Sequence, residues 1–166
     1  WIGIAPFAAH KGKIYPLEKM EQTIEQLIKA YPSCRIFFFG GGGKERETLD
    51  SWAKRYANCM NASAVLGGMR NELILMSHLD VMISMDSGNM HLASLVDTKV
   101  VSIWGATHPY AGFMGWNQSE ENAVQLDMAC RPCSVYGNKP CLRGDYACMN
   151  DIRPEMIVAK IKQLFN

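Results

Sequence analysis

The stretch "MISMDSGNMHLASLV", Met82 to Val96, joins an apolar run to a pattern of helical spacing. An uninterrupted apolar run is typical of a strand that is buried on both faces of a parallel sheet. At the junction lie the small polar residues 86–89, and His91 follows them. The backbone N–H groups and the dipole of a helix that starts there favour a bound anion. The plain alternative is that Asp86 or Ser87 serves only as the N-cap of this helix.

Outward from this stretch, apolar runs and helical patterns alternate along the whole chain. Strands are predicted at residues 2–7, 34–40, 80–85, 99–105 and 123–126, with a weaker strand-and-loop segment at 59–68. Helices are predicted at residues 17–31, around 49–56, and at 71–78, 89–96 and 153–165. Such alternation predicts an α/β fold with an open, doubly wound parallel sheet of the Rossmann-like kind.

We expect a single domain over residues 1–166, made of three parts. The core sheet and its helices occupy residues 1–127, a cysteine-containing loop occupies 128–152, and a C-terminal helix occupies 153–166. In open α/β sheets, ligands bind beyond the carboxyl ends of the strands. The residues that directly follow each strand are therefore the candidates for a site.

The bulk properties exclude some classes of protein. The 166 residues carry a formal net charge of +1, which argues against a nucleic-acid binder with its basic excess. No apolar run approaches the roughly 18 residues that a membrane-spanning helix needs. The opening "WIGIAPF" reads as a strand rather than as a signal peptide, so we expect a cut at a domain boundary of a longer protein.

Two further strand ends carry candidate residues. "AAHKGKIYP", residues 8–16, contains Lys13, which can serve a phosphate as a point charge or can simply be solvated. "GGGGKE", residues 40–45, is either a plain turn or a close approach to a ligand, with Glu45 (or its neighbour Glu47) near ribose hydroxyls. A carboxylate repels phosphate, so Asp86 suits sugar hydroxyls, and the pattern as a whole favours a sugar nucleotide. The loop "GATHPYAGFMGW", residues 105–116, either lines a sugar or acceptor pocket or lies at the surface.

Three segments, in order along the chain, resemble the signature of glycosyltransferase family 9, the ADP-heptose:lipopolysaccharide heptosyltransferases. They are "KIYP" at residues 13–16, "DSGNMHLASLVDTKVVSIWGATHP" at 86–109, and "CRPCSVYGNKPCLRGDYACMNDIRPEMI" at 130–157. The chain departs from the family pattern at Ala9, where the family has a hydroxylated residue, at Tyr15 in place of Trp, and at His108 in place of Asp. These departures bear on the identity of the sugar.

The resemblance implies the C-terminal, donor-binding half of a GT-B glycosyltransferase, with the N-terminal acceptor domain absent from this chain. It implies an inverting transfer of heptose or a related sugar from ADP-heptose to a lipopolysaccharide core or similar lipid-linked glycan. The fragment alone should bind donor without turnover. The whole enzyme should be cytoplasmic, at the inner face of the inner membrane, with peripheral membrane association through the full-length protein.

Residue by residue, the resemblance assigns the diphosphate to Lys13, which stabilises the leaving group, and to the backbone of residues 87–89. The donor-binding residues that it implies are Lys13, Glu45, Met69, Asp86, Ser87, Gly88, Asn89 and His91. Among these, Asp86 and His91 fall near the sugar, Glu45 near the nucleoside, and Met69 near the adenine. The sequence contains no Asp-x-Asp, which fits a donor site that requires no divalent metal.

Four cysteines cluster near the C-terminus: Cys130, Cys133, Cys141 and Cys148. They can form a structural zinc site, disulfides, or unligated thiols. Rival functions also stay open. A non-catalytic nucleotide-binding module or degenerate transferase is one alternative, and a GT-B sugar-nucleotide epimerase is another.

Overall fold

A six-stranded parallel sheet forms the centre of the computed structural model, which describes residues 1–165. Its strands are β1 (Ile2–Ala5), β2 (Ile36–Phe38), β3 (Cys59–Asn61), β4 (Val81–Met85), β5 (Val100–Ile103) and β6 (Ala123–Val124). They lie in the order β3-β2-β1-β4-β5-β6, and every neighbouring pair is parallel. The doubly wound Rossmann-like sheet is therefore confirmed, with its topological switch point between β1 and β4.

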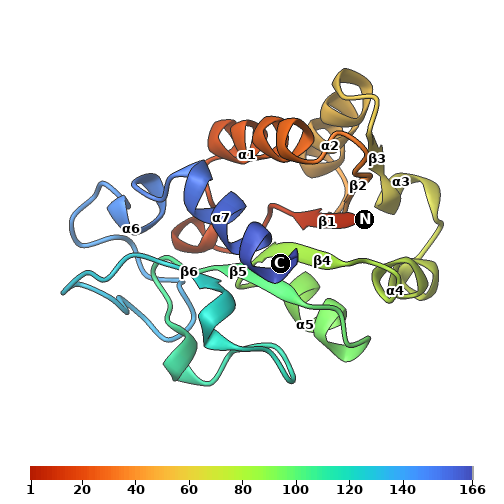
Figure 1. Cartoon of the computed structure of the whole chain (residues 1–166). Helices are drawn as coiled ribbons and strands as arrows, with labels where there is room; N and C mark the ends of the chain where they lie inside the picture. The colour runs from red at the N-terminus through yellow and green to blue at the C-terminus, as the bar shows by residue number, and fades with distance from the viewer. Residues whose placement is uncertain (166) are drawn as a thin grey trace.

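Helices cover both faces of the sheet (Figure 1). One face packs against α1 (Leu17–Ala30), α2 (Lys44–Arg55) and α7 (Pro154–Phe165). The other face packs against α3 (Ala62–Val65), α4 (Met69–Met76) and α5 (Gly88–Leu95). The remaining elements are α6 (Ala147–Asn150) and the 3₁₀ turns η1 (Lys11–Lys13), η2 (Pro109–Ala111) and η3 (Glu120–Asn122).

The largely apolar sequence of β4 follows from this double cover. Val81, Ile83 and Met85 belong to the core under α1, α2 and α7. Met82 points to the opposite side, into the core under α4 and α5. Successive side chains of a strand point to opposite faces, so the side chains of β4 pack alternately into the two cores. All five residues of β4 are buried.

The structure differs from the predicted elements in several places, and α2 begins at Lys44, before the predicted start near residue 49. Residues 62–65 form the short helix α3, where a strand-and-loop segment was predicted; the Asn61 side chain caps it by accepting from the Ala64 N–H at 3.3 Å. α4 begins at Met69, two residues earlier than predicted, after two glycines with positive φ. The predicted cysteine-containing loop includes the single-turn helix α6. Residue 166, the last of the predicted C-terminal helix, lies outside the described residues.

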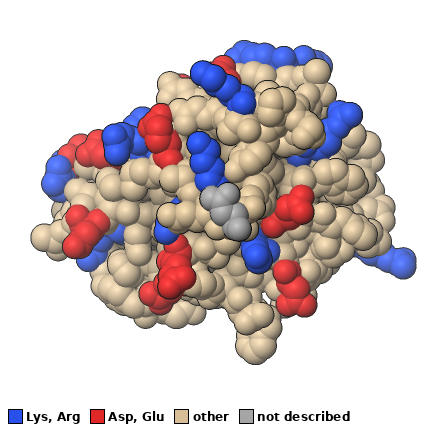
Figure 2. Space-filling view, viewed as in Figure 1, with Lys and Arg blue, Asp and Glu red and all other residues tan. Residues whose placement is uncertain are grey.

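The surface carries both signs of charge. On the face in Figure 2, Lys and Arg are interspersed with Asp and Glu, and broad uncharged areas separate them. This face therefore presents no continuous basic stripe of the kind that nucleic-acid binders use. Among the described helices, none is long and apolar enough to cross a membrane.

Candidate functional site

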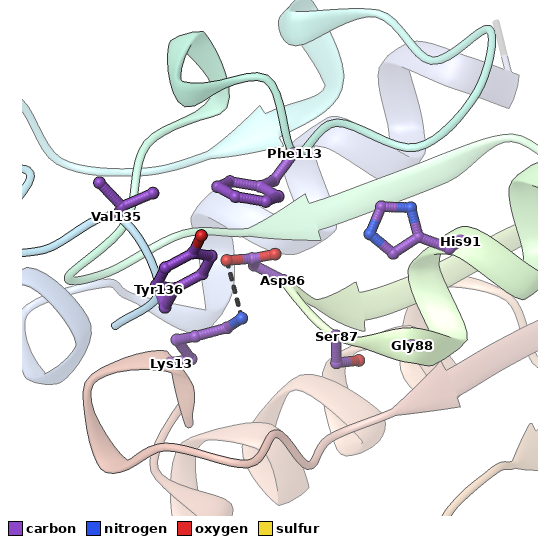
Figure 3. Close-up of a pocket in the computed structure, with 8 residues that line it drawn as sticks. All are labelled: Lys13, Asp86, Ser87, Gly88, His91, Phe113, Val135 and Tyr136. Carbon is purple, nitrogen blue, oxygen red and sulfur yellow. Dashed lines mark ion pairs between the residues drawn. The ribbon is translucent and has the colours of Figure 1, made fainter. Parts of the chain in front are cut away.

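Two pockets adjoin at the carboxyl ends of β1 and β4, where the switch point of the sheet predicts a ligand. Pocket A encloses about 190 Å³ and is lined by Lys13, Asp86, Ser87, Gly88, His91, Phe113, Val135 and Tyr136 (Figure 3). Pocket B encloses about 300 Å³ and is lined by Phe7, Ala8, Ala9, Glu45, Ser87, Gly88, Asn89 and Leu92. Ser87 and Gly88 line both pockets, so the start of α5 separates them.

The N-terminus of α5 is open to these pockets. Ser87 occupies the N-cap position, but its side chain makes no capping hydrogen bond within residues 1–165. A Cβ on Gly88 would meet none of the described atoms within 4 Å. The predicted capping hydrogen bond from Ser87 is therefore absent within residues 1–165, and the side of Gly88 is open. A helix start of this kind can bind an anion.

An ion pair lies in pocket A, between the two strand ends. The Nζ of Lys13 is 3.1 Å from the Oδ2 of Asp86, and the two side chains are only 16% and 6% exposed. The buried hydroxyl of Thr107 donates to the same Oδ2 at 2.8 Å. Among the described residues, these contacts use Oδ2 alone, so Oδ1 is left for a ligand. Figure 3 shows that second oxygen on the side of His91.

The cysteine-containing loop, residues 128–152, holds Lys13 in place. Gly137 has φ 72°, and a Cβ built on it would come within 2.7 Å of the Cγ and Cδ of Lys13. The methylene stem of Lys13 therefore packs directly on the backbone of Gly137. On its other side, η1 is fixed by the Gly12 carbonyl, which accepts from the Ala106 N–H at 2.9 Å. The ammonium is thus confined between two loops.

Arg131 of the same loop joins the ends of β5 and β6. Its guanidinium donates to the carbonyls of Gly105, Thr107 (2.9 Å) and Leu126, and to the side chain of Gln125 at 3.0 Å. Burial lowers the pKa of Arg131 below its usual value. Because the Thr107 hydroxyl contacts Asp86, a continuous polar chain connects Arg131 to Lys13.

Most of the predicted site residues come together. Lys13, Asp86 and His91 line pocket A, whereas Glu45 and Asn89 line pocket B. Ser87 and Gly88 lie between them. The Glu45 carboxylate also accepts from the Gly41 N–H at 2.7 Å, which ties the glycine loop to α2.

Met69 is the exception. It lies at the start of α4. Together with Leu73 and Ile74 it lines a separate groove on the surface of the described residues. The predicted contact between Met69 and the adenine therefore stays a prediction.

The sequence did not single out several residues that build pocket A. Thr107, Arg131, Val135, Tyr136 and Gly137 lie in loops without periodicity, and their partners are distant along the chain. The resemblance covers segments that contain them, but it assigns them no role. Phe113 lies within a loop that was considered as a pocket wall, and it does line pocket A.

The four clustered cysteines lie in the cysteine-containing loop. Within residues 1–165, all cysteines are free thiols, and no group of three or more His, Cys, Asp or Glu side chains is placed to hold a metal ion. The Cys133 thiol instead donates to the Cys130 carbonyl at 3.2 Å. Burial raises the pKa of Cys148. The choice among a structural zinc site, disulfides and unligated thiols stays a prediction.

Comparisons with known proteins point to one family. The family model for glycosyltransferase family 9 (heptosyltransferase) matches residues 1–141. Lipooligosaccharide heptosyltransferase 2 of Campylobacter jejuni is 29% identical over 139 residues, which are 80% of this chain and 42% of that protein.

Solved structures share the fold. The Escherichia coli ADP-heptose lipopolysaccharide heptosyltransferase II superposes with a TM-score of 0.73 at 19% identity, over 98% of this chain and 45% of that one. The iron-containing dodecameric glycosyltransferase TibC of enterotoxigenic E. coli gives 0.68 at 15% identity, over 99% and 46%. TibC has also been solved in complex with ADP-D-β-D-heptose. The chain spans less than half the length of each of these proteins.

Proposed function

Because the chain belongs to glycosyltransferase family 9, we propose that it is the donor-binding half of an inverting heptosyltransferase. The whole enzyme would transfer heptose from ADP-heptose to a lipopolysaccharide core or a similar lipid-linked glycan. Two findings support this proposal. The C. jejuni relative is a lipooligosaccharide heptosyltransferase, and the chain spans 42% of that protein, about one half of it. In this proposal, residues 1–166 form the C-terminal domain, and a preceding N-terminal domain carries the acceptor site.

The observation that carries the proposal is the uncapped start of α5 between two pockets, beside the Lys13–Asp86 pair. We place the diphosphate of the donor on the amides of residues 87–89, where the helix dipole favours negative charge. The donor sugar then occupies pocket A. The nucleoside lies toward pocket B, with Glu45 near the ribose and Met69 near the adenine.

In the proposed reaction, an acceptor hydroxyl attacks the anomeric carbon of the heptose from the face opposite the diphosphate. The new C–O bond forms as the bond to the diphosphate breaks, so the configuration inverts. The electron pair leaves with ADP, and the acceptor proton passes to a base outside this chain. Lys13 and the α5 amides stabilise the charge that develops on the leaving diphosphate. The fragment alone binds donor without turnover.

The proposal also sets a location. The full-length enzyme would work in the cytoplasm, at the inner face of the inner membrane, and would reach its lipid-linked acceptor through the N-terminal domain. Ammonium and amide groups are assigned to the diphosphate, so the proposed donor site calls for no divalent metal.

Calorimetric titration of the full-length protein with ADP, UDP and GDP tests the donor site. We expect ADP to bind best, and we expect Lys13→Ala to weaken it by about 1–3 kcal/mol, the scale of a charged hydrogen bond. Lys11→Ala is the matched control, because the Lys11 ammonium lies over the Tyr146 ring, 4.7 Å from its centroid. Negligible binding of all three nucleotides to folded protein would overturn the donor-site assignment. ADP binding without heptose transfer would instead support a non-catalytic module.

A further inference from the structure

Pocket A has walls of two chemical kinds. The first wall carries polar and charged side chains: Lys13, Asp86, Ser87 and His91. The second wall is aromatic and aliphatic: Phe113, Val135 and Tyr136. The proposed function uses the first wall for the diphosphate and the sugar hydroxyls, and it assigns nothing to the second.

The second wall is built from two loops that are distant along the chain and adjacent in the fold. The rings of Phe113 and Tyr136 have centroids 5.7 Å apart and planes inclined by 56°. Figure 3 shows both rings beside the Lys13–Asp86 pair, on ribbons from separate parts of the chain. Tyr136 is 62% exposed, and the next residue, Gly137, packs on Lys13. The wall therefore has a defined position relative to the ammonium, although much of its apolar surface is open.

The paired walls restrict what can occupy the pocket. A phosphate group needs only donors and positive charge, and it gains nothing from two aromatic rings. A sugar ring presents hydroxyls along its edge and C–H groups on its faces. Its hydroxyls can bond to the free Oδ1 of Asp86 and to His91, while a C–H face packs on the negative face of an aromatic ring. This division matches the two walls.

We infer that Phe113 and Tyr136 form the platform on which the donor sugar packs, and that they discriminate the nucleotide sugar from the bare nucleotide. The inference rests on the proposed function, because it places the sugar in pocket A. It adds that the affinity for the sugar portion depends on aromatic contact as well as on Asp86. The ADP portion lies outside this contact.

Calorimetry with ADP and with ADP-heptose, in the absence of acceptor, tests the inference on the full-length protein. Phe113→Ala and Tyr136→Ala should each weaken ADP-heptose about 2- to 12-fold, the scale of one aromatic contact. Both variants should bind ADP as the wild type does. Tyr136→Phe keeps the ring and should keep the ADP-heptose affinity.

Two controls make the outcome decisive. Trp116→Ala removes a 74% exposed ring from the same loop as Phe113 and should change neither affinity. Thermal melting of each variant monitors folding. Because Tyr136 is exposed, substitutions at this position should leave the protein folded. An unchanged ADP-heptose affinity in folded Phe113→Ala and Tyr136→Ala would overturn the inference. An equal loss for ADP would also overturn it, by placing the base on these rings. Wild-type protein that binds neither ligand would overturn the proposed function and the inference together.

Discussion

The polar wall of pocket A and the cysteine-containing loop that supports it differ in how far the sequence alone predicts them. The polar wall comes from one short run, residues 86–91, and from Lys13. The loop supplies the supporting residues Arg131 and Gly137 from a segment whose only regular element is α6 within the described residues. Groups that meet a ligand must have a particular chemistry, which is visible in a sequence. Groups that position them act through contacts with segments distant along the chain, which are visible only in the fold.

The largest expected effect tests the polar wall itself. Asp86→Ala leaves the Lys13 ammonium and the Thr107 hydroxyl without their shared partner in a largely buried setting. We expect a loss of about 3 kcal/mol in the free energy of unfolding, measured by urea denaturation. Thr107→Val removes one neutral donor and should cost about 1 kcal/mol. A smaller loss for Asp86→Ala than for Thr107→Val would contradict the central place of the carboxylate.

The next effect tests the loop as a structural clamp. Arg131→Met leaves the carbonyls of Gly105, Thr107 and Leu126 without their donor. We expect a loss of about 2 kcal/mol, seen as a lower melting temperature. Arg143→Met is the matched control, because Arg143 pairs with Asp145 at the surface. Equal melting temperatures for the two variants would show that the clamp contributes nothing to stability.

A smaller effect separates support from chemistry. Gly137→Ala forces a Cβ against the stem of Lys13 and strains a positive φ. We expect a loss of about 1–2 kcal/mol in stability, together with weaker ADP binding in calorimetry. Gly144→Ala imposes similar strain at φ 80°, where a Cβ would meet no described atom within 4 Å. It should lose stability without losing ADP affinity. An equal change in ADP affinity in both variants would remove Gly137 from the positioning of Lys13.

The smallest effect concerns reactivity alone. Backbone N–H groups, that of Tyr146 first, lower the pKa of the half-buried Cys141 thiol, so more of it is thiolate near neutral pH. Burial raises the pKa of Cys148, and it raises that of Cys59 to about 12. Iodoacetamide labelling read by mass spectrometry should therefore modify Cys141 first, and raising the pH should accelerate Cys148 more than Cys141. Joint protection of the four loop cysteines, released by a chelator, would instead indicate a bound metal.

The sequence was sufficient for much of the fold because the central strands are buried on both faces. Every strand of the sheet was predicted at the right place, since runs such as "VMISM" admit few other structures. The helix α3 was missed because four residues carry no periodicity, although Asn61 is a recognisable cap. Among the site residues, the run 86–91 and Lys13 were predicted to lie together, and they do. Thr107 and Arg131 were not singled out, because a hydroxyl and a guanidinium that bond to distant loops leave no local pattern.

The central position of β1 has a consequence for biosynthesis. β1 pairs with β2 on one edge and with β4 on the other, so a nascent chain that stops short of Met85 has a central strand with an open apolar edge. Such an edge is a template for association with other chains. Lys13 follows β1 and Asp86 follows β4. The two residues therefore come together only after β4 has paired with β1. A ligand that contacted both Lys13 and Asp86 would bind the closed state alone and would stabilise newly closed protein by mass action.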